Sequence, residues 1–353
     1  MDAAFLRPLL FSLASALVLV PLCCRAARWL GLLDPPGPRK QQEQGVPLLG
    51  GVALLLALLC GLAAGGQLPP QGWWRIGAGA LIVLLVGLLD DLRKRHGGLR
   101  ARSKFLGQSL AVLILLSDRL SPVLGGRAGL AECISLLVLI FLLLSIINAQ
   151  NAVDNMNGLS AGLALVTAGV CVAASPSSGS TGLGMMAAAL AGSLAGFLPF
   201  NYPRAGAYLG DAGSYLAGFL VAVLALDLTT GFHSGRVTVL SGEDLPAALL
   251  LVSVPLFDLG FSVFHRLREG RPVSQGDARH LSHRLVAVGF RPAVAVLLLV
   301  AAQVLGCAVG WLLLESGFLL AMTGIALVLT LFLGGALLLI RAERKSRAAG
   351  QDH

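Results

Sequence analysis

Residues 131–158 decide the fold and read AECISLLVLIFLLLSIINAQNAVDNMNG. The run 131–148 is almost entirely apolar, and its eighteen residues come close to the ~20 that a helix needs to cross the hydrocarbon core of a bilayer. The ten residues 148–157 then hold four asparagines and one aspartate. Burying so many amide and carboxylate groups is costly unless they bind something polar. The stretch therefore predicts a membrane-spanning helix that ends in a functional polar cluster.

The rest of the chain repeats this alternation of apolar runs and polar clusters. Of 353 residues, 56% are hydrophobic and only 12% are charged, and the mean hydropathy is +0.82. A soluble domain has about 25% charged residues, so the composition excludes a water-soluble enzyme. The apolar runs are continuous, which argues against a closed β-barrel. The sequence predicts an all-α, polytopic integral membrane protein.

Eleven apolar runs are candidate transmembrane helices. They cover residues 4–23, 47–65, 74–90, 106–124, 131–148, 158–174, 182–200, 213–231, 246–264, 293–313 and 317–340. With the N-terminus placed outside, 21 of the 26 Lys and Arg residues fall on one side of the membrane. Cytoplasmic loops carry the excess of basic residues, so that side is predicted to be cytoplasmic and the net charge of +8 does not indicate a nucleic-acid partner. We expect one membrane domain over residues 1–345 and a cytoplasmic tail over 346–353.

Five polar segments lie on the predicted cytoplasmic side, and they hold the candidate functional residues. The first contains three prolines within residues 35–38, where the backbone cannot be helical. Arg39 and Lys40 therefore lie on a constrained loop, which serves either as a positive membrane anchor or as a substrate contact.

The second segment begins where Asp90 and Asp91 end an apolar run. A carboxylate near the hydrocarbon costs at least ~2.5 kcal/mol, so two adjacent ones need a partner. Neighbouring residues on a helix point about 100° apart. We expect one aspartate to contact a metal ion and the other to hold a lysine or a reacting group. The alternative is an interfacial cap with the basic residues 93–95 as counter-ions.

The third and fourth segments carry amides and single carboxylates. Asn148, Asn151 and Asp154 recur every three residues and share one face if the preceding helix continues. Asn201 stands between two aromatic residues, and Asp211 is flanked by small residues that let a polyanion or a hydrated metal ion approach the backbone. Asp211 can also cap the helix that follows it.

The fifth segment is the longest cytoplasmic loop. His280 and His283 are three residues apart and share a helix face, with Arg284 beside them. The alternative interpretation is a solvated basic loop. The carboxylates and amides suit a hard cation, and the basic side chains suit phosphates. Together the segments indicate phosphoryl chemistry supported by magnesium.

In this order, the five segments resemble the polyprenyl-phosphate N-acetylhexosamine-1-phosphate transferases over about residues 30–290. Asp90-Asp91, followed by Lys104, is similar to the paired aspartates and lysine of that family. The other matching motifs are Asn148-x-x-Asn151-x-x-Asp154 for NxxNxxDGxDG, Asn201 with Leu209-Gly210-Asp211-x-Gly213-Ser214, and the histidine-rich His280-Leu281-Ser282-His283-Arg284 ending at Gly289.

The resemblance implies transfer of a sugar 1-phosphate from a UDP-N-acetylhexosamine to undecaprenyl phosphate, with release of UMP. It implies Asp211 as the principal ligand of Mg²⁺, or of Mn²⁺, with Asp154 completing the metal environment. Asp90 and Asp91 would position or activate the lipid phosphate, and Asp154 would belong to the same catalytic group. The implied substrate-binding residues are Arg39, Lys40, Lys104, Asn148, Asn151, Asn201, His280, His283 and Arg284.

Two departures from the family pattern concern the third and fifth segments. The family's DGxDG reads Asp154-Asn155-Met156-Asn157-Gly158 here, so the second aspartate is replaced by Asn157. The amide can still coordinate or donate, but one negative charge is lost. The middle of the histidine run is Ser282, which leaves two histidines where many members have three.

Eleven spans with a cytoplasmic tail favour an N-acetylglucosamine-type enzyme over the ten-span phospho-N-acetylmuramoyl-pentapeptide transferase. The expected setting is the bacterial inner membrane, with the lipid bilayer as a partner and a homodimer as the expected assembly. A transporter of an anionic solute is the alternative from another class, because it also uses intramembrane carboxylates. It predicts polar groups at mid-membrane and an internal repeat, whereas the polar groups here gather at one face.

Overall fold

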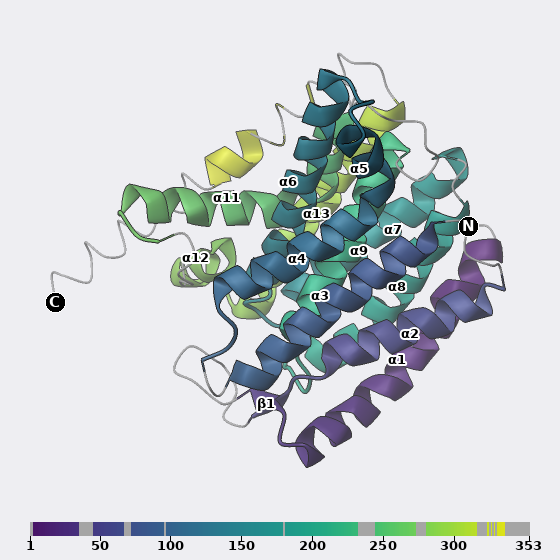
Figure 1. Ribbon diagram of the computed structural model, residues 1–353. Helices are drawn as coiled ribbons and strands as arrows, with labels where there is room; N and C mark the ends of the chain where they lie inside the picture. The colour runs from purple at the N-terminus through teal and green to yellow at the C-terminus, as the bar shows by residue number, and fades with distance from the viewer. Residues whose placement is uncertain are drawn as a thin grey trace, which may run out of the picture.

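The computed structural model describes residues 3–34, 45–66, 72–94, 97–178, 181–231, 244–272, 280–315 and part of 323–335. The helices are α1 (Ala3–Trp29), α2 (Gly50–Ala64), α3 (Trp73–Arg93), α4 (Ala101–Leu115), α5 (Ser117–Leu124), α6 (Leu130–Ala152), α7 (Leu159–Ser178), α8 (Thr181–Asn201), α9 (Gly210–Thr230), α10 (Asp244–Leu251), α11 (Ser253–Arg268), α12 (Leu281–Ala287) and α13 (Pro292–Glu315). A two-residue antiparallel ladder joins β1 (Leu33–Asp34) to β2 (Val46–Pro47). The helices form one bundle, from which α11 projects (Figure 1).

Among the described residues, five helices are long and apolar enough to cross a membrane, namely α1, α6, α8, α9 and α13. The number rises to seven if two bent pairs, α4 with α5 and α10 with α11, each count as one span. Large apolar side chains such as Leu106 and Phe141 are about 70% exposed on the outer surface, as lipid contact requires. These findings confirm a nearly all-helical membrane protein. The count of eleven and the position of the termini stay predictions, and most of the run 317–340 lies outside the described residues.

Helix α9 forms the centre of the bundle, and almost every one of its residues is buried. It contacts α2, α3, α6, α7 and α10, and it lies among them in Figure 1. Glycines permit the close approach at its first turn. A Cβ on Gly87 of α3 would overlap the backbone of Asp211 and Ala212, and a Cβ on Gly51 of α2 would overlap Gly213. This packing brings the end of α3 directly against the start of α9.

Two of the predicted spans are bent. The run 106–124 becomes α4 and α5, which meet at 81°, and the run 246–264 becomes α10 and α11, which meet at 86°. A break of this kind frees backbone N–H and C=O groups from their helical partners, and each unpaired group in an apolar interior costs several kcal/mol. Other groups of the protein must therefore bind the freed backbone.

A buried side chain of α13 satisfies the break between α10 and α11. Gln303 Nε2 donates to the carbonyl of Leu251 at 2.6 Å, and its Oε1 accepts the N–H of Val254 at 3.0 Å. Thr167 Oγ1 and Cys307 Sγ donate to the same carbonyl, at 2.8 and 3.4 Å. The amide of Gln303 thus binds both freed groups, and it fixes the direction in which α11 leaves the bundle. The carbonyl of Leu251 needs such a donor, because Pro255, four residues on, has no N–H.

We predict that Gln303→Leu lowers stability by about 1–3 kcal/mol, because the N–H of Val254 then has no partner in an apolar interior. The thermal unfolding midpoint of the purified protein in detergent measures the effect. Cys307→Ala is the matched control, since Gln303 and Thr167 still donate to the Leu251 carbonyl, and its midpoint should fall less. Equal midpoints for Gln303→Leu and the unmodified chain would contradict this account of the break.

Candidate functional site

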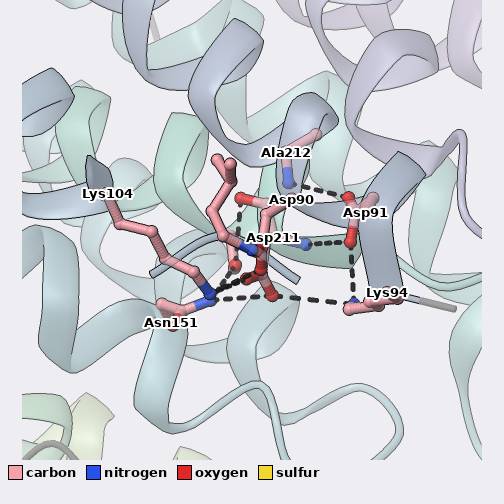
Figure 2. A network of polar contacts seen from close by, with 9 residues as sticks. Asp90, Asp91, Lys94, Lys104, Asn151, Asp211 and Ala212 are labelled. Carbon is pink, nitrogen blue, oxygen red and sulfur yellow. Dashed lines mark hydrogen bonds and ion pairs between the residues drawn. The ribbon is translucent and has the colours of Figure 1, made fainter. Parts of the chain in front are cut away.

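The candidate site lies where the end of α3 and the first turns of α4 and α9 meet the end of α6. Figure 2 shows three carboxylates and two lysines in one network of polar contacts. The members are Asp90, Asp91, Lys94, Lys104 and Asp211. Sequence reasoning places both aspartates of α3 in the catalytic group, but the structure gives the two carboxylates different neighbours.

Asp91 binds the backbone at the start of α9. Its Oδ1 and Oδ2 accept the N–H groups of Asp211 and Ala212, each at 3.0 Å (Figure 2). Its side chain is only 2% exposed, and Lys94 Nζ lies 2.7 Å from Oδ1. Gly210 has a φ of +68°, and a Cβ there would overlap the carboxylate. The capping role that was the alternative for the aspartate pair therefore describes Asp91, although it caps α9 and not its own helix.

The carboxylate of Asp90 contacts the second lysine of the network, Lys104. Lys104 Nζ lies 2.5 Å from Asp90 Oδ2 and 3.1 Å from Asp211 Oδ2. The N–H of Leu99 donates to Asp90 Oδ1, which ties the loop after α3 to the same carboxylate. Asp90 is therefore a group that holds the predicted phosphate-binding lysine in place.

Asp211 is the carboxylate on which the network converges. Besides Lys104, it lies 3.7 Å from Lys94 Nζ and accepts Asn151 Nδ2 at 3.3 Å. Asn151 also donates to Ser214 Oγ at 2.8 Å, so the end of α6 is fixed to the first turn of α9. The Asp211 side chain is 18% exposed, against 2% and 3% for Asp91 and Asp90. Of these three carboxylates, Asp211 is the one that an incoming ligand can reach.

A cavity of about 500 Å³ opens beside Asp211, and all five polar segments contribute to it. Its lining consists of Asp34, Leu48, Lys94, Asn151, Asp154, Asn155, Met156, Asn157, Asn201, Tyr202, Pro203, Tyr208, Gly210, Asp211, His283, Val286, Pro292, Ala293 and Val296. The charged lining comes mainly from the starts and ends of helices α3, α6 and α9. Residues of α12 and α13 add an apolar wall. The cavity can thus take a ligand that has both phosphate groups and an uncharged part.

Asp154 lies in the loop after α6 and lines this cavity. Burial raises the pKa of its carboxyl to about 7, and the neighbouring carboxylates of Asp211, Asp91 and Asp34 act in the same direction against Lys94. Burial alone would lower the pKa of Lys94, but Asp91 and Asp211 raise it above its ordinary value, so this lysine stays charged. The charged residues in the lining of the cavity therefore include more carboxylates than lysines.

Two of the predicted substrate-binding asparagines hydrogen-bond to other parts of the protein. Asn148 donates to Gln108 Oε1 at 2.7 Å and to the Leu144 carbonyl, so it joins α6 to α4 and does not line the cavity. Asn201 reaches the cavity, but its Oδ1 accepts the N–H of Gly158 at 2.6 Å and its Nδ2 donates to the Ala207 carbonyl. Asn201 holds two loops together at the rim of the site.

The residues of the histidine-rich segment also differ in whether they line the cavity. His283 lines the cavity, whereas His280 is buried, with Nδ1 hydrogen-bonded to Asp258 Oδ2 at 2.6 Å. The other oxygen of Asp258 accepts the N–H of Leu281 at 2.6 Å, where α12 begins. The guanidinium of Arg284 lies 4.9 Å from the ring centre of Phe261 and is buried against α11.

Sequence reasoning missed three residues of this region. Asp34 and Lys94 line the cavity, and Asp258 orients the histidine segment. Asp258 had a usable signal, because an ionisable residue inside an apolar run marks a functional position by default. Asp34 had no such signal in the sequence, since only the ladder with β2 brings it to the site. Arg39 and Lys40 lie outside the described residues.

We predict that Asp91→Asn destabilises the protein by about 1–3 kcal/mol, because one N–H of α9 and the charge of Lys94 lose their buried partner. Asp90→Asn makes the same chemical change one residue earlier and should lower the thermal midpoint less, since its partners are a partly exposed lysine and a loop amide. Unfolding followed by tryptophan fluorescence in detergent compares the two. A larger loss for Asp90→Asn would refute the capping role of Asp91.

Comparison with known proteins shows the family of the chain. The model of glycosyl transferase family 4 matches residues 73–229. A decaprenyl-phosphate N-acetylglucosaminephosphotransferase of Mycolicibacterium smegmatis is 32% identical over 76% of this chain and 72% of its own length. The enzyme of the same name from Mycobacterium leprae is 31% identical over 75% and 72%. An undecaprenyl-phosphate alpha-N-acetylglucosaminyl 1-phosphate transferase of Yersinia pestis is 27% identical over 90% and 87%. The chain therefore belongs to glycosyl transferase family 4.

Proposed function

We propose that the protein transfers N-acetylglucosamine 1-phosphate from UDP-N-acetylglucosamine to undecaprenyl phosphate and releases UMP. The observation that carries the proposal is the position of Asp211, which faces a polar cavity between Lys94 and Lys104 at the start of a buried helix. Relatives that match most of this chain are named for transfer of this sugar phosphate to a polyprenyl phosphate. The product would be a lipid-linked sugar pyrophosphate that initiates a cell-envelope glycan.

The residues of the cavity fit a magnesium ion. Mg²⁺ is usually held by one or two carboxylates together with water and substrate phosphates. Among the described residues no three His, Cys, Asp or Glu side chains form a closed ligand set, so substrate oxygens and water would complete the coordination. Asp211 and Asp154 would hold the ion, and Mn²⁺ would suit the same oxygen donors. When bound, the ion would neutralise the diphosphate of the donor.

The side chains of this site fit a direct displacement at phosphorus. The second pKa of a phosphate monoester is near 6, so the lipid phosphate already carries its nucleophilic charge at neutral pH and needs no general base. An oxygen of the lipid phosphate would bond to the β-phosphorus as the bond from that phosphorus to the bridging oxygen breaks, and UMP would leave with that oxygen. Lys94 and Lys104 would hold the phosphates, each kept in place by an aspartate of α3.

The position of the site suits one substrate that comes from water and one that comes from the lipid bilayer. The cavity lies beside the ends of helices whose outer surfaces are apolar. The basic residues cluster on the same side of the predicted topology, so we infer that the site opens to the cytoplasm, with the N-terminus outside and eleven spans in the bacterial inner membrane. The nucleotide sugar would enter from the cytoplasm and the lipid phosphate from the inner leaflet.

We predict that the purified protein releases UMP from UDP-N-acetylglucosamine when undecaprenyl phosphate and Mg²⁺ are present, and that chelation of the metal stops the release. Asp211→Asn should lower turnover at least a hundredfold, because it removes the one exposed carboxylate of the network. A panel with UDP-N-acetylgalactosamine and UDP-N-acetylmuramoyl-pentapeptide tests the sugar. Near-normal turnover of Asp211→Asn at saturating Mg²⁺ would rule out its role as a ligand. No UMP from any donor would favour the transporter.

We predict a second effect on metal dependence. Since the pKa of Asp154 is about 7 in the free site, a proton competes with the cation for this carboxylate at lower pH. The Mg²⁺ concentration for half-maximal rate should therefore rise by up to about tenfold per unit as the pH falls below 7, and stay constant above it. Asp154→Asn should need more Mg²⁺ at every pH and lose this dependence. A variant that retains the full pH dependence would show that another group competes with the ion.

A further inference from the structure

Asn155 and Ser282 form a hydrogen bond between two segments that are far apart in the sequence. Ser282 Oγ donates to Asn155 Oδ1 at 2.7 Å, across a separation of 127 residues. The other end of the amide is also held, because Asn155 Nδ2 donates to the carbonyl of Ala152 at 2.8 Å. The side chain of Asn155 is thus fixed at both ends in a single orientation.

This bond joins two parts of the cavity wall. Asn155 lines the cavity beside Asp154, and Ser282, only 1% exposed, precedes the lining residue His283. Helix α12 has just seven residues, and its first turn is bound to α11 through Asp258. The bond from Ser282 is a polar contact between α12 and the loop carrying Asp154, and Leu281 packs against Val153 of the same loop. Together these contacts set the position of His283 relative to the polar groups at the end of α6.

Both positions also depart from the family motifs, as Asn157 does. Asn155 stands at the glycine of DGxDG, and Ser282 interrupts the histidine run. A histidine ring at 282 would need the space that the Asn155 amide fills, because Ser282 is already in contact with it and is buried. A glycine at 155 would leave that space open. The residues at 155 and 282 are therefore matched to each other in size and in hydrogen bonding.

We propose that Asn155 and Ser282 act as a coupled pair of positioning residues that sets the fit of the nucleotide-sugar donor, an inference that rests on the proposed function. Among the described residues, neither side chain hydrogen-bonds to a member of the Asp90–Asp91–Asp211 network. The pair holds a neutral part of the wall, and this part binds the donor equally well before and during the reaction. Loss of the bond should then raise the KM for the donor and leave kcat unchanged.

A double-mutant cycle tests the coupling. Asn155→Gly and Ser282→Ala should each raise the KM for UDP-N-acetylglucosamine by about twofold to tenfold, as expected for one neutral hydrogen bond. The double variant Asn155→Gly/Ser282→Ala should be no worse than either single variant. The KM for undecaprenyl phosphate and kcat should stay within about twofold of the unmodified enzyme. Ser282→Thr keeps the hydroxyl and should keep the KM.

An exchange toward the family motif gives a second test. Ser282→His alone should impair donor binding more than Ser282→Ala, because the ring is crowded by Asn155. Adding Asn155→Gly should restore donor binding to that of Asn155→Gly or better. Asn157→Asp is the matched control, since Asn157 also departs from the motif but donates to the Pro203 carbonyl, and its effect should add to that of Ser282→Ala.

Three results would overturn the proposal. They are additive effects in the first cycle, a loss of kcat with an unchanged donor KM, and activity losses that simply follow the thermal midpoint. The unmodified enzyme is assayed in parallel and separates the two claims. If it releases no UMP, the proposed function itself fails, whereas normal UMP release with an additive cycle refutes only the coupling of Asn155 and Ser282.

Discussion

Asp91 accepts two hydrogen bonds from the first N–H groups of α9, and the rest of the site depends on this interaction. A buried carboxylate must be paired, and the first amides of a helix lack partners of their own. One side chain meets both requirements, and glycines at 87 and 210 let the two backbones come close enough for it. This contact places Lys94 and Asp211 next to each other, so the chemistry of the site follows from a helix cap.

Charge balance then separates the roles of the remaining groups. Asp90 and Asp91 are each matched by a lysine, and both lysines also face Asp211. The network itself is nearly balanced, but Asp154 and Asp34 add negative charge to the cavity lining. The raised pKa of Asp154 is the physical consequence. A cation bound at this cavity would offset part of the excess negative charge.

The second half of the site depends on hydrogen bonds from amides and hydroxyls and on the buried carboxylate of Asp258. Gln303 supplies the partners that the backbone loses where α10 and α11 meet at 86°. Helix α11 then presents Asp258 to the start of α12, and Ser282 connects α12 back to Asn155 beside the cavity. Amides and hydroxyls can make such connections inside an apolar bundle without the desolvation penalty of ions. These hydrogen bonds connect the wall that carries His283 to α11 and to the loop after α6.

The sequence by itself determined the class of the protein and predicted a polar site at the ends of apolar helices. Apolar runs ending in Asp90-Asp91, in Asn151 and Asp154, and beside Asp211 are local patterns, so hydrophobicity and spacing suffice to predict buried helices with a polar site at their ends. The resemblance of these motifs supplied the family.

Only the tertiary structure decided which polar residues line the cavity and which bind other parts of the chain. Asp91 and Asp90 are adjacent in the chain but have different partners, and Asn148 and Asn201 find theirs 40 and 43 residues away. Asp34 reaches the site through the β1–β2 ladder, and Asp258 reaches it through the bend between α10 and α11. No local sequence pattern predicts either feature. Sequence periodicity describes one element at a time, whereas the partner of a buried polar group is set by how separate elements pack, because that packing decides which groups lose water together.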